Sequence, residues 1–249
     1  MTAPTPNIDL AILDAREASA LATLRAAAAE QPAVFSTSFG AEDMVILDLI
    51  ARHGLDIASF TLDTGRLNEE TYAVMQAAEA RYGKVVFTHF PDAAAVAALV
   101  AKNGINGFYD SVDNRKECCG VRKMQPLAKA LAGKKAWVTG LRAAQSVTRT
   151  DTPAREFDDA RQLTKFNPLV DWSEAEVWAY IRRHDVPYNA LHDRFFPSIG
   201  CAPCTRSITP GEDVRAGRWW WENPESKECG LHVKDGQVSP LKFKAKESA

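Results

Sequence analysis

The stretch AVFSTSFGAEDMVILDLIARHG, residues 33–54, decides the fold of this 249-residue chain. Its first six residues, AVFSTS (33–38), predict a buried strand. A turn with Gly40 follows, and AEDMVILDLIARHG (41–54) predicts a helix that closes at Gly54. A strand that turns into a helix in this way is the repeating unit of an α/β sheet.

The same alternation continues along most of the chain. We expect further strands at 57–62, 84–89 and 136–139, and helices at 8–30, 67–82, 92–102, through 123–131 and at 172–184. Asp171 or Ser173 is expected to cap the last helix. The pattern predicts an α/β fold, with a doubly wound, mostly parallel sheet covered on both sides. From about residue 190 it gives way to an irregular, mobile C-terminal tail rich in Gly and Pro.

The composition, 46% hydrophobic and 25% charged, is that of a globular protein. The start of the chain has no secretory signal, and the longest apolar run (93–101) is far shorter than the roughly 20 residues that span a bilayer. We therefore expect a cytoplasmic protein with no membrane partner. Between Arg115 and Arg149 there are nine Lys or Arg against one acid. This run favours an anionic ligand, whereas its few aromatic residues argue against nucleic acid.

Three loops that follow predicted strands carry polar residues suited to an anion. In open parallel sheets, ligands bind beyond the carboxyl ends of the strands, so these loops should meet. Hydroxyls, glycines and guanidinium groups there suit phosphate or sulfate. The first loop alone would also fit an ordinary strand-to-helix turn, because neither GxxxxGK[ST] nor GxGxxG is present. The candidates are Ser36, Ser38, Phe39, Gly40 and Asp43, then Leu62, Thr64 and Gly65, and finally Gly140 and Arg142.

The five cysteines form two close pairs and one single residue. Cys118 and Cys119 are adjacent, Cys201 and Cys204 form a CxxC pair, and Cys229 stands alone. In a reducing compartment such pairs indicate metal or redox chemistry more than disulfides. Adjacent cysteines cannot easily close one tetrahedral zinc site, so the four favour a [4Fe-4S] cluster; zinc or unrelated buried thiols are the alternatives. Cys229 is then either a reactive thiol or an inert one.

Eight motifs, taken together in order and spacing, identify a family. The segments are STSFGAED (36–43), LDTGR (62–66), ECCGVRK (117–123), GLRAAQS (140–146), NPLVDWSEAEVW (167–178), SIGCAPCTR (198–206), GRWWWE (217–222) and ECGLH (228–232). They closely resemble the assimilatory sulfonucleotide reductases, specifically the iron–sulfur branch that acts on adenosine 5'-phosphosulfate (APS). The resemblance runs from about residue 33 to residue 232.

The resemblance implies a thioredoxin-dependent adenylyl-sulfate reductase with an adenine nucleotide alpha hydrolase-like fold. Residues 1–190 would form the nucleotide-binding domain, and residues 191–249 a cluster-ligating and catalytic segment of the same domain. Cys229 would attack the sulfate sulfur of APS, releasing AMP and leaving an S-sulfocysteine from which thioredoxin releases sulfite. The four paired cysteines would hold a [4Fe-4S] cluster that exchanges no electrons in this reaction. We also expect a homo-oligomer.

The resemblance also assigns the binding residues. Ser36, Ser38, Asp43, the LDTG turn and Gly140 would hold adenosine and phosphate. The negative charge that develops as AMP leaves would be stabilised by Lys123, Arg142, Arg215, Arg218 and His232.

Two departures and two rival functions stay open. The family commonly has a second basic residue where this chain has Ala143, and a Gly-Tyr pair where it has Phe195, Phe196 and Pro197. An ATP pyrophosphatase-like tRNA thiolase would share the fold, but it would need an SGGxDS-type loop. A nucleotide-binding iron–sulfur sensor is the rival without catalysis. The three tryptophans at 219–221 are expected to pack the tail against the body of the protein, with stacking on adenine as the alternative.

Overall fold

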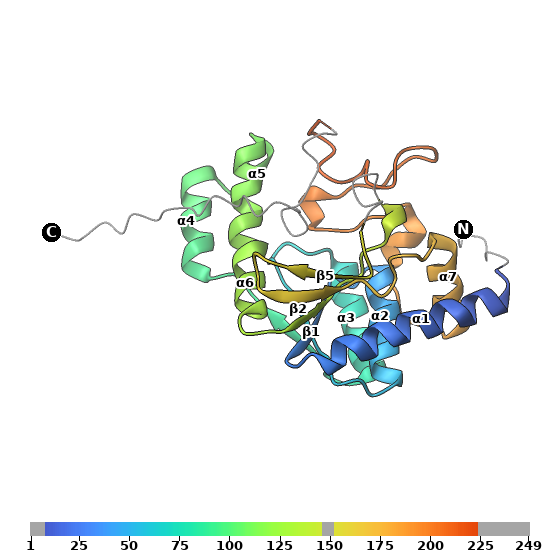
Figure 1. Cartoon of the computed structure of the whole chain (residues 1–249). Coiled ribbons are helices and arrows are strands. Elements are labelled where there is room, and N and C mark those ends of the chain that lie inside the picture. Colours follow the sequence, from blue (N-terminus) through green and yellow to red (C-terminus); the bar gives the residue numbers. More distant parts are fainter. Residues whose placement is uncertain (1–7, 146–151, 224–249) are drawn as a thin grey trace.

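The computed structural model describes residues 8–145 and 152–223. Its sheet has six strands in the order β3-β2-β1-β4-β6-β5, of which Figure 1 labels β1, β2 and β5. The strands are β1 (Ala33–Thr37), β2 (Ala58–Leu62), β3 (Val86–His89), β4 (Ala136–Val138), β5 (Arg155–Asp158) and β6 (Leu163–Phe166). Neighbouring strands are parallel except β5, which pairs antiparallel with β6. The prediction of a doubly wound, mostly parallel sheet is confirmed.

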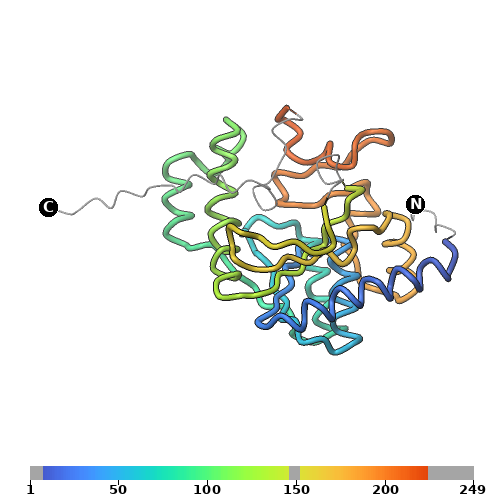
Figure 2. Tube along the Cα trace, viewed as in Figure 1, coloured from blue at the N-terminus to red at the C-terminus, as the bar shows by residue number. Residues whose placement is uncertain are grey.

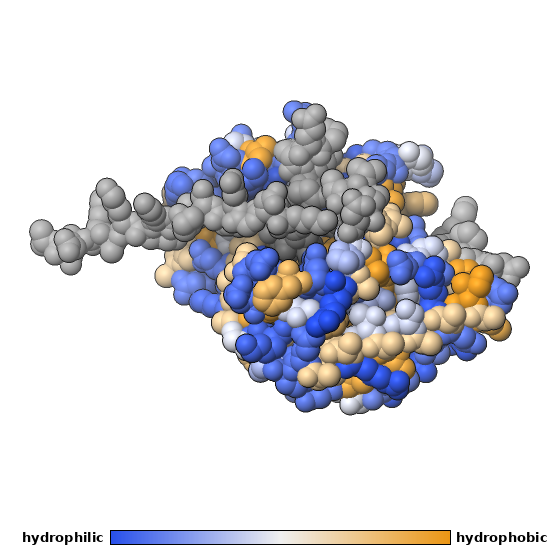
Figure 3. All heavy atoms as spheres, in the orientation of Figure 1, coloured by the Kyte–Doolittle hydropathy of each residue, from blue (hydrophilic) through white to orange (hydrophobic). Residues whose placement is uncertain are grey.

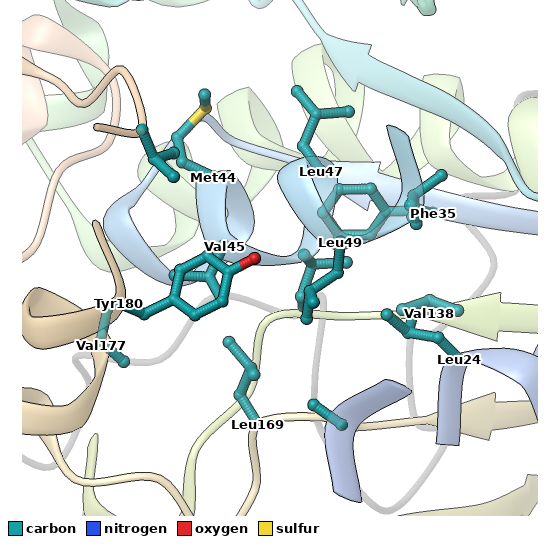
Figure 4. Packing of buried hydrophobic residues seen from close by; sticks show 14 of the residues in the cluster. Leu24, Phe35, Met44, Val45, Leu47, Leu49, Val138, Leu169, Val177 and Tyr180 are labelled. Atoms are coloured by element: carbon teal, nitrogen blue, oxygen red, sulfur yellow. The ribbon is translucent and has the colours of Figure 1, made fainter. Parts of the chain in front are cut away.

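Helices cover both faces of the sheet because side chains of its central strands alternate between two cores. The helices are α1 (Leu10–Ala29), α2 (Ala41–Arg52), α3 (Glu69–Tyr82), α4 (Ala93–Asn103), α5 (Val112–Cys119), α6 (Gln125–Leu131) and α7 (Glu174–Arg183). Phe35 and Val138 point into the larger core, with residues of α1, α2 and α7 (Figure 4). Val34 and Trp137 point the other way, into a smaller core with Leu127 of α6.

Strands β5 and β6 and helix α5 were absent from the sequence prediction. Each of the two strands has only four residues, and charged residues interrupt their apolar ones, so neither presents a clear alternating run. Helix α5 has no apolar stripe, because its only buried side chain is Arg115. It continues through a π-helical turn, Gly120–Met124, into α6. Pro126 at the start of α6 lacks an N–H and would crowd a regular turn, which accounts for the wider one.

The topology places a binding crevice between β1 and β4. From β1 the chain winds through β2 and β3 on one side, and β4, β6 and β5 lie on the other. Doubly wound proteins bind ligands at this reversal of strand order, beyond the carboxyl ends of the strands. Figure 2 shows the segment 190–223, coloured orange to red, gathered on one side of the sheet.

The segment 190–223 is irregular, as expected. It contains only the short turns η5 (Ala190–Arg194) and η6 (Ala202–Cys204). It is tied to the loop after β2, because the Ala202 N–H donates to the Arg66 carbonyl at 2.8 Å and Asn68 Nδ2 donates to the Gly200 carbonyl at 3.1 Å. The expected mobility of the tail concerns residues beyond the described part of the chain.

Within the described residues, no helix is long and apolar enough to cross a membrane. Figure 3 shows one face of the molecule, on which hydrophobic side chains are interspersed with hydrophilic ones.

Candidate active site

The loop between β1 and α2 is folded by its own side chains. The Thr37 hydroxyl accepts the Phe39 N–H at 2.9 Å, and Phe39 takes a left-handed conformation with φ 58°. The Ser38 N–H and hydroxyl both donate to Asp43 Oδ2, at 2.6 and 2.7 Å. Gly40 then caps α2 with extended backbone, and it lines a cavity in front of that helix. The start of α2 therefore offers the cavity the N–H groups and partial positive charge that suit an anion.

Asp43 and Gly140 join this loop to the end of β4. Burial raises the pKa of Asp43 to about 6, although the hydrogen bonds from Ser38 act in the opposite direction. Gly140 lies against the same carboxylate, so that a Cβ there would overlap Asp43 Oδ1. Only glycine fits at this position, because the two loops approach each other through its missing side chain.

Arg142, predicted to bind an anion, is buried and already ion-paired. Its Nε and Nη2 each lie 2.8 Å from Glu42 Oε1, and its Nη1 donates to the Trp172 carbonyl at 3.3 Å. Glu42 was not predicted as a site residue. Its carboxylate fixes the orientation of the guanidinium and offsets its charge.

The cavity between these loops has a volume of about 280 Å³, close to the lower end of the range of about 300–1,000 Å³ typical of small-molecule sites. Most of the predicted binding residues line it: Ser36, Ser38, Gly40, Asp43, Leu62, Thr64, Lys123, Gly140, Arg142, Arg215 and Arg218. Phe39 does not, because its side chain is buried in the larger core. Gly65 does not line it either, and forms the turn in which its N–H donates to Asp63 Oδ1 at 2.7 Å. His232 and Cys229 lie outside the described residues.

Several lining residues were missed by the sequence reasoning. Trp137 donates its indole N–H to the Ser36 hydroxyl at 2.8 Å and so forms part of the wall beside β1. The others include Thr71, Thr139, Gln145, Glu174, Trp178 and His192. Glu174 and Trp178 are four residues apart on α7, and no local sequence pattern marked this helix as functional beyond its membership in a family motif.

One wall of the cavity is basic and lies beside the cysteines. It is formed by Lys123, Arg215 and Arg218. Arg218 is only 8% exposed, and a Cβ at Gly200 would overlap its guanidinium. The positive charges of Lys123 and Arg218 both act to lower the pKa of the Cys204 thiol, which places the sulfur close to them.

The structure brings the two predicted cysteine pairs together. Cys118 and Cys119 end α5, whereas Cys201 caps the start of η6 and Cys204 is its last residue. Burial is the main cause that raises the pKa of Cys118, and it raises that of Cys204 to about 12. The charge of Cys201 contributes to both shifts, so these sulfurs are close enough for their thiolates to repel one another. Cys201 is buried, with its sulfur 3.3 Å from the Thr64 hydroxyl.

The four cysteines do not form a site for a single metal ion. Among the described residues, no group of three or more His, Cys, Asp or Glu side chains has the arrangement of a single-ion site. A cubane, whose separate irons bind separate thiolates, would need the four sulfurs to be spread more widely than a single ion does.

The end of the described chain is anchored to α5. Arg115 and Glu222 form a buried ion pair, with Nη2 2.7 Å from Oε2 and Nε 2.8 Å from Oε1. The indole of Trp219 lies 4.7 Å from the guanidinium carbons of both Arg115 and Arg218. Trp221 packs against Tyr109, with ring centroids 4.5 Å apart. Trp219 and Trp221 pack this segment against the body as expected, whereas Trp220 is 39% exposed, and Trp219 in addition lines the cavity.

Fold and site together define a doubly wound α/β protein with a cavity at the topological switch point and four cysteines next to its basic wall. Residues 32–207 match the model of the phosphoadenosine phosphosulfate reductase domain. The chain belongs to this family.

Each match to an APS reductase covers most of this chain and most of the relative. An adenosine 5'-phosphosulfate reductase of Allochromatium vinosum is 57% identical over 231 residues, covering 92% of this chain and 90% of the relative. One of Burkholderia cepacia is 50% identical, with 86% and 85% covered. A phosphoadenylyl-sulfate reductase structure from Candida auris, in complex with phosphate, is 25% identical with a TM-score of 0.65, and covers 82% of this chain and 100% of that one. Yeast FAD synthetase in complex with FAD, 14% identical with a TM-score of 0.56 over 81% of this chain and 70% of its own, shares the fold alone.

Proposed function

We propose that this protein reduces APS to sulfite and AMP, with Cys229 as the nucleophile and thioredoxin as the reductant. The Cys229 thiolate attacks the sulfate sulfur, the bond from that sulfur to the bridging oxygen breaks, and AMP leaves with the electron pair. A thioredoxin thiolate then attacks Cys229 Sγ of the S-sulfocysteine, and sulfite departs. The second thioredoxin thiol resolves the mixed disulfide, so the dithiol supplies the two electrons that the sulfur gains.

The high identity to relatives named APS reductases, over nearly the whole chain, carries this proposal. The cavity supports it chemically, because an anion-binding helix start faces a wall of basic side chains. Gly40 and Ser38 at the start of α2 suit the phosphate, and Lys123, Arg215 and Arg218 suit the sulfate. The wall beside Ser36 and Trp137 would receive the adenosine.

We assign Cys118, Cys119, Cys201 and Cys204 as ligands of a [4Fe-4S] cluster. When bound, such a cluster supplies a structural link between α5 and η6 and fixes charge beside the substrate. Lys123 follows Cys119 by four residues and lines the cavity, so its ammonium group can act on the sulfate and on the ligand sulfurs together. The lone thiol outside this set is then free for chemistry.

Cys229 can reach the cavity from the anchored segment. It follows the anchored Glu222, itself three residues after the cavity-lining Trp219, by seven residues. An extended chain spans about 3.3–3.6 Å per residue, so these residues can span a distance of up to roughly 25 Å. A thioredoxin donor also implies a reducing, cytoplasmic setting, and we keep the homo-oligomer as part of the proposal.

The decisive test uses radiolabelled APS and the substitution Cys229→Ser. The wild-type protein, incubated with [35S]APS and separated on a non-reducing gel, should carry label that thioredoxin releases as sulfite. C229S should carry no label and form no sulfite, yet retain iron and bind AMP. C204S is the matched control, because it should lose iron. Sulfite production by C229S, or zinc in place of iron in the purified protein, would refute the proposal.

A further inference from the structure

The smaller core of the protein opens into the cavity, and Ser36 lies at this opening. Val34 and Phe60 are buried in that core. Ser36 follows Val34 by two residues on β1 and is in register with Phe60 of β2, so its side chain leaves the sheet on the same face. Ser36 is half-buried and lines the cavity. It is therefore a polar residue at the rim of an apolar surface.

Three apolar side chains surround this opening. Leu62 of β2, Leu127 of α6 and Trp137 of β4 belong to the smaller core or pack against it, and all three also line the cavity. Apolar walls cannot replace the water around a phosphate or sulfate group, whereas they suit a flat and weakly polar ring system. This part of the cavity therefore suits a purine base, whose polar edge atoms would meet Ser36.

Trp137 fixes the hydrogen bonding of the Ser36 hydroxyl. Its indole N–H donates to Ser36 Oγ at 2.8 Å. The indole nitrogen is a donor only, so in this bond the hydroxyl must accept. The Trp137 ring is itself buried, and Lys165 Nζ and the Arg161 guanidinium carbon lie 5.8 and 5.5 Å from its centroid. These contacts hold the ring, so the indole N–H is a fixed donor.

The hydrogen of the Ser36 hydroxyl is left for a ligand. A serine hydroxyl has one hydrogen and two lone pairs, and Trp137 uses one of the lone pairs. Among the described residues, the Ser36 hydroxyl donates to no acceptor. Because Ser36 lines the cavity, this hydrogen can meet an acceptor of a bound molecule. At the edge of an adenine base, the acceptors are the ring nitrogens.

We propose that Trp137 is a positioning residue, which holds the Ser36 hydroxyl as a hydrogen-bond donor to a ring nitrogen of the adenine base. This inference rests on the proposed function for the identity of the nucleotide. The indole N–H engages a lone pair of the hydroxyl oxygen and so directs the hydroxyl hydrogen away from itself, toward the cavity. Without the indole N–H, the hydroxyl would be free to rotate and to act as donor or acceptor. The preference for a base with an acceptor nitrogen at this place would then weaken.

The first test needs no substitution and measures the affinities of the wild-type protein, as purified, by calorimetry. The ligands are AMP and its 1-deaza, 3-deaza and 7-deaza analogues, each of which has C–H in place of one ring nitrogen. The analogue that lacks the acceptor for Ser36 should bind at least about fivefold more weakly than AMP, because the hydroxyl then loses its partner in a closed site. Equal binding of all four would overturn the proposal. Failure of AMP itself to bind would instead refute the nucleotide site of the proposed function.

The second test repeats the series with Ser36→Ala. AMP should bind S36A at least about fivefold more weakly than it binds the wild type, and one analogue should bind S36A as well as AMP does. That analogue identifies the ring nitrogen that the Ser36 hydroxyl meets. If every analogue kept the loss relative to AMP that it shows with the wild type, the hydroxyl would not meet a ring nitrogen, and the proposal would be wrong.

The third test separates positioning from packing, with Trp137→Phe. This variant keeps an aromatic ring but has no N–H, so the ratio of the affinities for AMP and for the sensitive analogue should narrow by at least about twofold. Trp221→Phe is the matched control and should leave this ratio unchanged, because Trp221 lies outside the cavity and its indole nitrogen has no hydrogen-bond partner in the described part of the chain. A benzothienylalanine residue at position 137, which has the shape of tryptophan without the N–H, serves if W137F does not fold. An equal loss of affinity for both ligands would show that the indole only fills space, and would overturn the positioning role.

Discussion

The two sides of the cavity are held by different forces. On the side of the sheet, Ser38, Asp43 and Gly140 are fixed by hydrogen bonds and close backbone approach within a few residues of β1 and β4. On the other side, the segment 190–223 has no core of its own and is fixed by contacts such as Arg115 with Glu222, which are 107 residues apart. The sheet side is preorganised by local structure, whereas the irregular side depends on a few long-range polar contacts.

The largest effect is expected where the irregular side is anchored. Arg115→Leu leaves the Glu222 carboxylate buried without its charged partner, which costs about 3–5 kcal/mol in the free energy of unfolding. We expect the double variant R115L/E222L to recover much of this loss, because replacement of both partners removes the buried charge. Urea unfolding of both variants measures the difference. If the double variant instead lost the sum of the stabilities lost by the single variants, the ion pair would not be what anchors this segment.

On the sheet side, Asp43 is expected to make stability depend on pH. Its pKa in the folded protein, about 6, exceeds the ordinary value of 3.8, so the folded state binds this proton more tightly than the unfolded state. The stabilising contribution is therefore complete below pH 4 and lost as the pH rises through 6. The free energy of unfolding of the wild type minus that of Asp43→Asn should fall by at most about 3 kcal/mol between pH 4 and pH 7. A difference that is flat with pH, measured by urea unfolding, would contradict this.

A smaller effect tests the close approach of the two sheet loops. Gly140→Ala places a Cβ against Asp43, and overpacking of this kind costs about 1–3 kcal/mol. AMP affinity should fall as well, because the loop after β4 lines the cavity. Gly120→Ala is the control: Gly120 has helical backbone with nothing near its missing Cβ, so it should be neutral or stabilising by about 0.5–1 kcal/mol. If thermal unfolding showed the same loss of stability in both variants, the close approach of the two loops would not be its cause.

The smallest effect lies in the irregular segment, at a residue with left-handed backbone. Phe195 is 59% exposed and has a left-handed conformation with φ 64°. A left-handed conformation costs an ordinary residue about 1–2 kcal/mol, which glycine avoids at some cost in chain entropy. Phe195→Gly should therefore raise the free energy of unfolding by up to about 1 kcal/mol. A measurable decrease would show that the exposed ring contributes packing that outweighs the strain.

The sequence by itself determined the class of the sheet, four of its six strands and a group of residues that line the cavity. Strands such as 33–37 and helices such as 41–52 carry local patterns of burial, and ligands gather at strand ends in any doubly wound sheet. Such features depend on neighbouring residues alone, so the sequence is enough to predict them. The capping of α7 by Ser173, with Glu176 completing a capping box, is of the same kind.

Only the tertiary structure decided which distant groups meet. It placed Phe39 in the core, paired Arg142 with Glu42 and set His192 beside Trp178. It also formed α5 around the buried Arg115, whose partner Glu222 comes from a segment without periodicity. The physical reason is that ion pairs and cavity walls join residues far apart in the chain, and no local pattern of hydrophobicity records such a contact.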